Sequence, residues 1–307
     1  MKPPVVSVVM PVYNAGLYLS QAVESIQAQS FSGFEFIIID DGSTDDGSKI
    51  LKKYAEQDKR IKLITQKNQG LVASLNRGIK QAKGKYIARQ DADDASAPLR
   101  LEKQVHYLEA HPEVVAIGSS VEVMDEAGKI LHRHTVLLND PELRQELLVR
   151  SPFAHGAVMF KRQAALEAGL YDQASWPVED YDFWLRLSKY GQLANLDEYL
   201  YIYREHGQSI SSENAELQQR QLEAVRAEAW VERGRLLPQR QPKISAYKKL
   251  DMGQLRIERL FDNVVLISKA AWRHHQKNLA LKILSQLATS PSAHRKAAGK
   301  LRRKVAK

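Results

Sequence analysis

The chain has 307 residues, of which 44% are hydrophobic and 26% charged, and it contains no cysteine. This length allows one large domain or about two ordinary ones, and the composition is typical of a globular protein rather than a disordered one. The lack of cysteine excludes disulfides, thiolate metal sites and cysteine nucleophiles.

The formal charge of +9 is distributed unevenly. All 36 acidic residues lie within the first 262 residues, so that part carries a slight net negative charge, whereas the rest has eleven lysines and arginines and no acid. A nucleic-acid-binding groove is expected to be basic within the folded domain itself. The charge pattern therefore argues against a nucleic-acid-binding protein, and we expect no nucleic-acid partner.

The start of the chain has no apolar segment typical of a signal peptide. Its longest apolar runs, such as residues 5–12, are much shorter than the ~20 residues that a membrane span needs. We therefore expect a soluble or peripheral protein.

The first hundred residues alternate strand-like and helix-like segments. Ser43 or Thr44 is the expected N-cap of the second helix, with acids in its first turn. Near-continuous apolar strands that alternate with helices predict an α/β fold with a buried, mostly parallel sheet. The predicted strands span residues 5–10, 34–39, 61–65 and 86–88, and the predicted helices span 17–28, 45–57 and 71–83.

The pattern then changes in two stages. Helices are predicted over 98–110 and 181–190, and strands over 114–124, 157–160 and 199–203, with the strand 114–124 paired through a turn at 125–128. From about residue 213 only helical patterns remain. We expect a first domain of residues 1–212 and a helical C-terminal extension of residues 213–307 that ends in the basic tail.

Three aspartates, Asp91, Asp93 and Asp94, follow the fourth predicted strand. In an extended chain, side chains two positions apart lie on one face, so Asp91 and Asp93 can approach the same cation. Mg²⁺ typically takes one or two carboxylates together with substrate phosphates. An isolated D-x-D is more often a solvated acidic loop, so the interpretation depends on the residues around it.

Two further polar turns follow predicted strands of the same sheet, where ligands of such sheets bind. Asp40 and Asp41 precede a glycine, and a carboxylate there can accept hydrogen bonds from a base or ribose. Turn chemistry explains the glycine but does not require two acids. The turn at Pro11, Tyr13 and Asn14 offers a polar aromatic ring able to cover a base.

Glu179 and Asp180 open a predicted helix. Acids in a first turn stabilise the helix dipole, and that role explains such residues about as often as a function does. The functional interpretation is a general base at the edge of a cleft. His155 and His206 receive no role from the residues alone, because a lone histidine is more often structural than a ligand.

Together these residues resemble family 2 glycosyltransferases, which have a nucleotide-sugar-binding GT-A fold with a mostly parallel central sheet. The ordered matches cover roughly residues 5–212, and the run from Gly84 to Gly118 also resembles a subgroup associated with bacterial surface-polysaccharide synthesis. The matching stretches are VSVVMPVYNAGLYLSQAVESIQAQSF, FIIIDDGSTDD, the run from Asn68 to YIARQDADD, HGAVMFKR, VEDYDFWLRL and YREHGQSIS.

The resemblance implies a role for each matching residue. Asp180 is implied as the catalytic base, with Glu179 as the alternative because some members align better with the glutamate. Asp93 is implied as the direct ligand of Mn²⁺ or Mg²⁺, with Asp91 nearer the donor sugar or ribose. The implied donor-binding residues are Pro11, Tyr13, Asn14, Asp40, Asp41, Asn68, Gly70, Asp91, Asp93 and Asp94, and the implied metal ligands are Asp93, Asp91 and His206.

The implied activity is that of an inverting, metal-dependent glycosyltransferase. It would move a sugar from a nucleotide-diphosphate donor, with a UDP-sugar favoured, to a hydroxyl of a saccharide or lipid-linked acceptor. The product would be O-antigen, capsule or exopolysaccharide, made in the cytoplasm or on the inner face of the cytoplasmic membrane. The sequence differs from the subgroup at Gln90, where an apolar residue is usual, and at residues 95–97.

Other functions fit the sequence less well. A nucleotidyltransferase would want a basic, glycine-rich loop after the first strand, and an NAD enzyme a G-x-G-x-x-G motif. A sugar hydrolase needs two carboxylates but has no use for the D-x-D. The alternative from another class is a non-catalytic membrane or nucleic-acid adaptor with a glycosyltransferase-like domain.

The C-terminal extension has apolar residues at helical spacing between residues 257 and 287. We expect helices that pack on the catalytic domain or form a homodimer. The alternative is a basic surface on anionic lipid, to which each Lys or Arg near the membrane adds ~1 kcal/mol.

Overall fold

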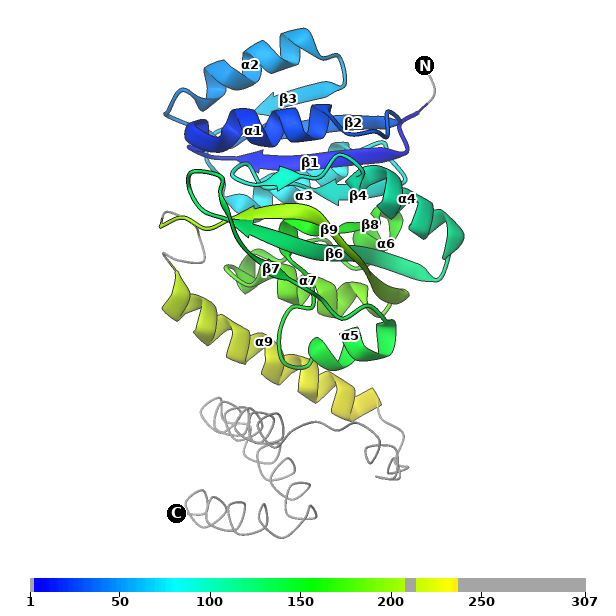
Figure 1. The fold of residues 1–307 in the computed structure, drawn as a ribbon. Helices are drawn as coiled ribbons and strands as arrows, with labels where there is room; N and C mark the ends of the chain where they lie inside the picture. Colours follow the sequence, from blue (N-terminus) through cyan, green and yellow to red (C-terminus); the bar gives the residue numbers. More distant parts are fainter. Residues whose placement is uncertain (1–2, 208–213, 237–307) are drawn as a thin grey trace. The chain divides into compact units, whose positions relative to one another are not determined.

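The computed structural model describes residues 3–207 and 214–236 (Figure 1). In these ranges nine strands form one sheet. The strands are β1 (Val6–Val12), β2 (Phe34–Asp40), β3 (Ile61–Thr65), β4 (Tyr86–Arg89), β5 (Ala95–Ser96), β6 (Val114–Met124), β7 (Ile130–His134), β8 (Met159–Lys161) and β9 (Gln192–Arg204). The helices are α1 (Gly16–Gln27), α2 (Gly47–Gln57), α3 (Leu71–Gln81), α4 (Arg100–Ala110), α5 (Asp140–Glu146), α6 (Arg162–Glu167), α7 (Glu179–Leu187) and α9 (Ala215–Leu236), with 3₁₀ turns η1 (His155–Ala157) and η2 (Gln173–Ser175).

The sheet has a parallel half and a mixed half, with the strand order β3-β2-β1-β4-β8-β6-β9-β5. Strands β3, β2, β1 and β4 are parallel, as their apolar runs predict. Strand β8 runs antiparallel to β4 and β6, and β9 runs parallel to β6. The predicted α/β class with parallel strands is confirmed, and the second half adds antiparallel neighbours at β5, β7 and β8.

The register of the parallel strands brings their carboxyl ends to one edge. Val12 pairs with Asp40, and Asp40 pairs with Thr65. Arg89, the last residue of β4, pairs with Val9 of β1, so the chain after β4 leaves the sheet beside the end of β1. The loops that carry the predicted donor and metal residues therefore begin from the same edge.

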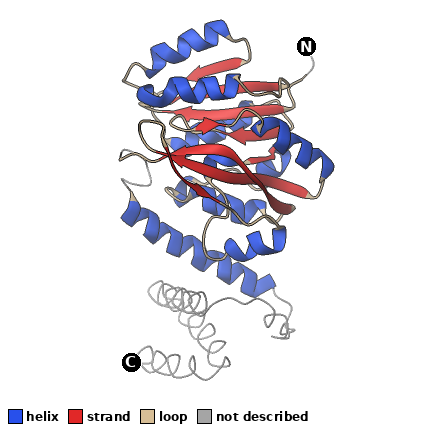
Figure 2. Ribbon diagram, in the orientation of Figure 1, coloured by secondary structure: helices blue, strands red, loops and turns tan. Residues whose placement is uncertain are grey.

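Helices cover both faces of the sheet (Figure 2). Successive residues of a strand point to opposite faces. Accordingly, Val8 and Met10 of β1 belong to the core that includes the buried residues of α1, whereas Val9 touches Gly78 of α3. A Cβ at Gly78 would collide with Val9, so the glycine permits α3 to lie directly on β1.

Helix α7 is held by an aromatic cluster. Trp184 is fully buried and meets Phe153 edge-on, with 5.4 Å between ring centroids. Phe183 packs on Tyr171 at 4.4 Å and on Phe160 of β8 at 5.3 Å. Large aromatic contacts of this kind dominate core packing. They fix the first residues of α7 relative to β8.

The prediction for the start of α2 is wrong. This helix begins at Gly47, with no acid in its first turn and no capping bond from Ser43 or Thr44. Thr44 instead donates its backbone N–H to Asn14 Oδ1 at 2.8 Å, and the Asn14 N–H donates to Ser43 Oγ at 3.2 Å. The two polar residues thus link the loops after β1 and β2 rather than ending a helix.

A short element in the second half also differs from its prediction. The expected strand over 157–160 is divided between η1 and β8, which begins at Met159. The cause is local, because the backbone N–H of Ala157 bonds to the carbonyl of Ala154 at 3.0 Å and closes a turn there.

The first compact unit of the chain ends at Gln218. The predicted boundary at residue 212 falls in the 208–213 gap, and the division into two domains stays a prediction. The basic tail, its amphipathic helices and the predicted dimer or membrane contact lie outside the described residues. Among the helices of residues 3–207 and 214–236, none combines the length and the apolar character that crossing a membrane requires.

Candidate active site

The predicted site residues meet at the carboxyl edge of the sheet. They come from the loops after β1, β2, β3 and β4, from the chain just beyond β9, and from the first turn of α7. The side chains of each loop have different hydrogen-bond partners, and these partners determine which ligand atoms the side chains can still bind.

Tyr13 and Asn14 form the exposed part of the β1 loop. The Tyr13 side chain is 52% exposed, and Asn14 adopts a left-handed backbone with φ 51°, which asparagine tolerates better than most residues. Asn14 also links this loop to the loop after β2 through Thr44. Pro11 lies inside β1 and is buried, so it is placed beneath the loop rather than at its surface.

Asp40 and Asp41 are both buried at the end of β2. The Asp40 carboxylate accepts hydrogen bonds from the Ser43 N–H at 3.0 Å and from the Ser48 hydroxyl of α2. These bonds hold the turn between β2 and α2. A further contact from Asp40 to a donor stays a prediction.

Asp41 joins the β2 end to the loop before α3. Its carboxylate accepts from Gln66 Nε2 at 2.6 Å, the Gln69 N–H at 2.9 Å and the Gly70 N–H at 2.8 Å. A carboxylate has about four acceptor positions, so about one remains for a ligand. Gly70 has φ +87°, which suits glycine, and Asn68 Oδ1 lies 3.2 Å from its N–H.

The D-x-D aspartates have different partners. Asp91 forms an ion pair with Arg89, and its N–H donates to the Tyr201 hydroxyl at 3.1 Å. Asp93 Oδ2 lies 2.9 Å from His206 Nε2. Asp94 is buried and accepts the Arg204 N–H at 2.7 Å. Burial and the neighbouring Asp93 raise the pKa of Asp94 to about 7.

Asp93 and His206 fit a divalent cation that the substrate helps to hold. Carboxylate oxygen and imidazole nitrogen suit Mn²⁺, and Mg²⁺ binds through few carboxylates plus substrate phosphates. Within the described ranges, no group of three or more His, Asp or Glu side chains converges. The cation at this pair stays a prediction.

Arg204 fixes the D-x-D loop from the end of β9. Its guanidinium donates to the carbonyls of Asp93 at 2.9 Å, Asp125 at 2.9 Å and Glu126 at 3.0 Å. It also lies over the Tyr18 ring of α1, 4.5 Å from the ring centroid. No role for this arginine was predicted from the sequence, although it lies two residues before His206 in the YREHG stretch.

Gln90 lies beneath the same loop and is fully buried. Its Nε2 donates to the carbonyls of Asp91 at 3.0 Å and Asp94 at 3.2 Å, and its Oε1 accepts from Ser96 at 2.7 Å and Arg100 at 3.2 Å. The departures from the subgroup at Gln90 and at residues 95–97 are thereby connected. They supply one hydrogen-bond network that spans both ends of the aspartate loop.

Replacing Gln90 by Leu is expected to destabilise the fold by about 1–3 kcal/mol, because buried donors of Ser96 and Arg100 lose their acceptor. The aspartate loop also loses two anchoring bonds, so the Mn²⁺ concentration for half-maximal activity is expected to rise. Thermal unfolding and a Mn²⁺ titration measure the two effects. The exposed Gln163→Leu is the matched control; an unchanged Mn²⁺ requirement in Gln90→Leu would limit Gln90 to a stabilising role.

Glu179 and Asp180 form the first turn of α7. Glu179 is 5% exposed, and its Oε2 has no hydrogen-bond partner in the described part of the chain. Burial and the adjacent Asp180 raise the pKa of Glu179 to about 7. Burial also raises the pKa of Asp180, whose side chain is only partly buried. Of the two acids, Asp180 is therefore the one better placed to meet a substrate.

His155 and Arg89 stand between these groups. His155 Nε2 lies 2.9 Å from the Tyr171 hydroxyl, and burial lowers the pKa of His155 well below its usual value. His155 is thus a neutral, hydrogen-bonded residue, in agreement with the structural role that lone histidines usually have. No role was assigned to Arg89 from the sequence. The available signal was its position in the matching stretch YIARQDADD, directly before Gln90.

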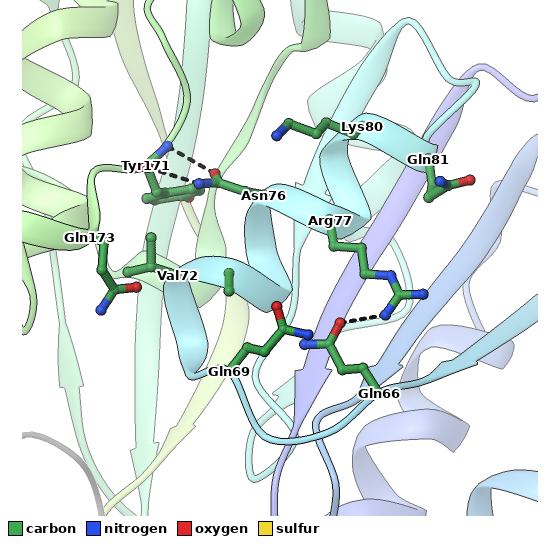
Figure 3. A pocket seen from close by; sticks show the side chains of 10 residues that line it. Gln66, Gln69, Val72, Asn76, Arg77, Lys80, Gln81, Tyr171 and Gln173 are labelled. Carbon is green, nitrogen blue, oxygen red and sulfur yellow. Dashed lines mark hydrogen bonds between the residues drawn. The ribbon is translucent and has the colours of Figure 1, made fainter.

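A groove of about 490 Å³ runs along α3 beside the loop at Tyr171 (Figure 3). Asn76 bonds to the Tyr171 backbone through both amide atoms, at 2.8 and 3.0 Å. Gln66 bonds to Arg77 at 2.6 Å as well as to Asp41. None of the predicted site residues lines this groove, which borders the candidate site through Gln66 and Gln69, both bonded to Asp41. It is lined by Gln66, Gln69, Val72, Ala73, Asn76, Arg77, Lys80, Gln81, Tyr171 and Gln173.

The order of the strands, with polar loops at the carboxyl ends of the parallel ones, is that of the GT-A fold. Two solved structures share the fold. Staphylococcus aureus TarS 1-349 in complex with UDP-GlcNAc has a TM-score of 0.60 at 18% identity and covers 91% of this chain and 88% of its own. Mannosyltransferase PcManGT from Pyrobaculum calidifontis, in complex with GDP-Man and Mn²⁺, has a TM-score of 0.55 at 18% identity, with 100% and 80% covered.

Residues 7–170, more than half of the chain, match the family model described as Glycosyl transferase family 2. The chain belongs to this family. It is 41% identical to glycosyltransferase EpsE of Bacillus subtilis over 66% of this chain and 73% of the relative. It is 35% identical to the O-antigen biosynthesis glycosyltransferase WbnJ of Escherichia coli, over 66% and 81%.

Proposed function

We propose that the protein is an inverting, metal-dependent glycosyltransferase of bacterial surface-polysaccharide synthesis. Its donor is a nucleotide-diphosphate sugar, most simply a UDP-sugar, and its acceptor is a hydroxyl of a saccharide or lipid-linked saccharide. The observation that carries the proposal is the presence of two groups within electrostatic range of Arg89: the aspartate loop with its Asp93–His206 pair and the acid pair that opens α7. The relative named for O-antigen biosynthesis supports the product class.

The donor is held by the loops of the parallel half. The Tyr13 ring is exposed and able to cover the base, and the remaining acceptor position of Asp41 receives a donor N–H or hydroxyl. Asp93 and His206 would hold the cation beside the donor diphosphate. When bound, this cation supplies positive charge that stabilises the diphosphate as a leaving group.

The acceptor is activated from the other side of the site. Asp180 takes the proton from the acceptor hydroxyl while the hydroxyl oxygen attacks C1 of the sugar. The bond from C1 to the diphosphate breaks as the new glycosidic bond forms, and the electron pair leaves with the diphosphate. A single displacement of this kind inverts the configuration at C1.

A donor panel tests the function directly. The purified full chain is incubated with UDP-, GDP- and dTDP-sugars and Mn²⁺, and released nucleotide is measured with and without EDTA. Slow, metal-dependent release from one donor is expected, since water replaces the absent acceptor. No release together with no metal-dependent nucleotide binding would favour the adaptor instead.

The α7 acids predict the pH dependence of transfer. Burial and the adjacent Asp180 raise the pKa of Glu179 to about 7, and burial raises the pKa of Asp180, so Glu179 takes up a proton as the pH falls through about 7. The uncharged Glu179 makes Asp180 a weaker base, so kcat/KM is expected to fall between about pH 8 and 6, whereas an ordinary glutamate with pKa about 4 would not titrate in this range. Initial rates across this range, with Mn²⁺ and nucleotide binding measured in parallel, provide the check.

Glu179→Gln is the informative variant for this prediction. Removing the negative charge beside Asp180 favours the ionised aspartate, so the acid limb of the profile is expected to move to lower pH. An acid limb that stays in place would assign the titration to another group.

The cellular setting of the enzyme is proposed on the same basis. A lipid-linked acceptor and a nucleotide-sugar donor would meet at the inner face of the cytoplasmic membrane. The basic tail after Asp262 is suited to anionic lipid or to packing against another copy of the chain. The tail lies outside the described residues, and its role stays a prediction.

A further inference from the structure

Arg89 is a buried cation on a rigid base at the end of β4. Its backbone N–H donates to the Val158 carbonyl at 3.0 Å, and its carbonyl accepts from Arg100 Nη2 at 2.8 Å. Arg100 is itself fully buried and bonded to Gln90 and Ser96. The backbone that carries the Arg89 side chain is therefore fixed from both neighbouring elements.

The Arg89 guanidinium is only 3% exposed. It forms one ion pair, with Asp91 of the D-x-D, and its Nε has no hydrogen-bond partner among residues 3–207 and 214–236. A buried ion pair with unused donors is weak evidence for a stabilising role, since apolar replacements are often as stable. This placement therefore suits a residue whose charge is needed at the site.

The charge of Arg89 reaches the acids on both sides of the site. It forms an ion pair with Asp91 in the aspartate loop. On the other side, the Arg89 N–H bonds to Val158 at 3.0 Å, and His155, three residues earlier, packs on Trp184 of α7 with 6.0 Å between ring centroids. In line with this placement, Arg89 lowers the pKa values of Glu179 and Asp180 at the start of α7, against the larger effect of burial. These two groups of acids come from parts of the chain about ninety residues apart. Arg89 lies within electrostatic range of both.

Two titratable side chains that pack against α7, those of Tyr171 and His155, are neutral. Burial raises the pKa of Tyr171 well above its usual value and lowers that of His155 well below. Both rings pack against Trp184 of α7. Arg186 lies on the same helix but is paired with Asp182 at 2.6 Å. Within the described part of the chain, Arg89 is thus the cation that acts on the α7 acids.

We propose that Arg89 is a positioning residue that connects the two halves of the site: it holds the Asp91 carboxylate for the donor and places a positive charge beside the Glu179–Asp180 pair. The proposal rests on the proposed transferase function. It gives one side chain two separable effects, because the fork of the guanidinium orients Asp91 whereas its charge alone acts on the α7 acids. Lysine preserves the charge but not the planar fork.

Three variants of the full chain separate these effects. Arg89→Met removes both effects, and Arg89→Lys keeps the charge. Arg162→Met is the control, because the Arg162 side chain bonds to the backbone carbonyls of Ile79 and Lys80, away from the site. The measurements are kcat and donor KM across pH with the donor found in the panel. Calorimetry of UDP and of that sugar nucleotide, each with Mn²⁺, gives a readout independent of turnover.

Arg89→Met is expected to lower kcat/KM by about 10²-fold or more, since small misplacements at a catalytic site have effects of that size. Its acid limb is expected to move upward by about one pH unit, because a favourable charge beside the base is gone. Arg89→Lys is expected to keep the acid limb of the wild type and to raise the donor KM. In both variants the sugar nucleotide loses more affinity than UDP.

The outcomes are distinguishable. A wild-type chain that neither binds nor consumes any donor overturns the transferase function, and the inference with it. If the wild type is active but Arg89→Met keeps the wild-type acid limb and the wild-type preference for the sugar nucleotide, the inference about Arg89 is wrong and the transferase function stands. This holds even if the variant melts at a lower temperature. If Arg89→Met fails to fold, an unchanged donor KM in Arg89→Lys would likewise overturn the inference about Arg89.

Discussion

Replacing Asp180 by Asn is expected to lower the turnover of transfer by about 10²–10⁴-fold, which is the usual contribution of a positioned general base. An amide is unable to accept the proton of the acceptor hydroxyl, and Glu179 is too deeply buried to take its place. The fold is expected to persist, because the ring contacts of Phe183 and Trp184 hold α7 without using the Asp180 carboxylate. Rates are measured at saturating donor and Mn²⁺, with thermal unfolding alongside.

Asp182→Asn is the control for this experiment. It changes an acid on the same helix that is paired with Arg186, and its turnover is expected to stay within a few-fold of the wild type. Near-normal turnover in Asp180→Asn with a large loss in Glu179→Gln would move the base to Glu179. Near-normal turnover in both variants would remove α7 from the chemistry.

Asp93→Ala is expected to lower turnover by about 10²-fold or more, the range seen when a group that stabilises developing charge is removed. Asp93 lies 2.9 Å from His206, and this pair is the protein part of the proposed cation site. The variant is expected to bind UDP with the same affinity in the presence and absence of Mn²⁺, whereas the wild type binds more tightly with the metal. Calorimetry and a Mn²⁺ titration of activity measure these effects.

The exposed Asp46, whose carboxylate contacts Lys49, provides the control variant Asp46→Ala. It removes a charge of the same kind without touching the site, so its response to Mn²⁺ is expected to match the wild type. His206→Ala is expected to raise the half-saturating Mn²⁺ concentration. An Asp93→Ala variant with an undiminished Mn²⁺ response would exclude Asp93 as a ligand.

The parallel half of the fold is readable from sequence because burial there is complete. Every residue of β1 and β2 is buried, so the apolar runs identify both strands, and the acids that follow are placed at one edge by the rule for parallel strands. The start of α2 was not readable in this way. Ser43 and Thr44 have the side chains of helix caps, but Asn14, about thirty positions earlier, occupies them.

The site was predictable as a set of acids but not as a set of contacts. Asp93 and His206 are 113 positions apart, and Asp94 and Arg204 are 110 apart; no local pattern pairs such residues. Arg89 and Arg100 were missed for a different reason, since arginine is rarely fully buried and sequence patterns place it at the surface. Gln90 was noticed only as a departure, and its bonds to Ser96 and Arg100 give it a physical explanation.

Gly156 in η1 lies against the Asp91 carboxylate and the Tyr201 hydroxyl, where a Cβ would overlap the hydroxyl. At this point the site is therefore lined by the backbone of Gly156, and a substitution that adds a side chain there is not tolerated. Changes of substrate preference must come from elsewhere on the rim, and the exposed ring of Tyr13 is one place where a change of size costs the fold little.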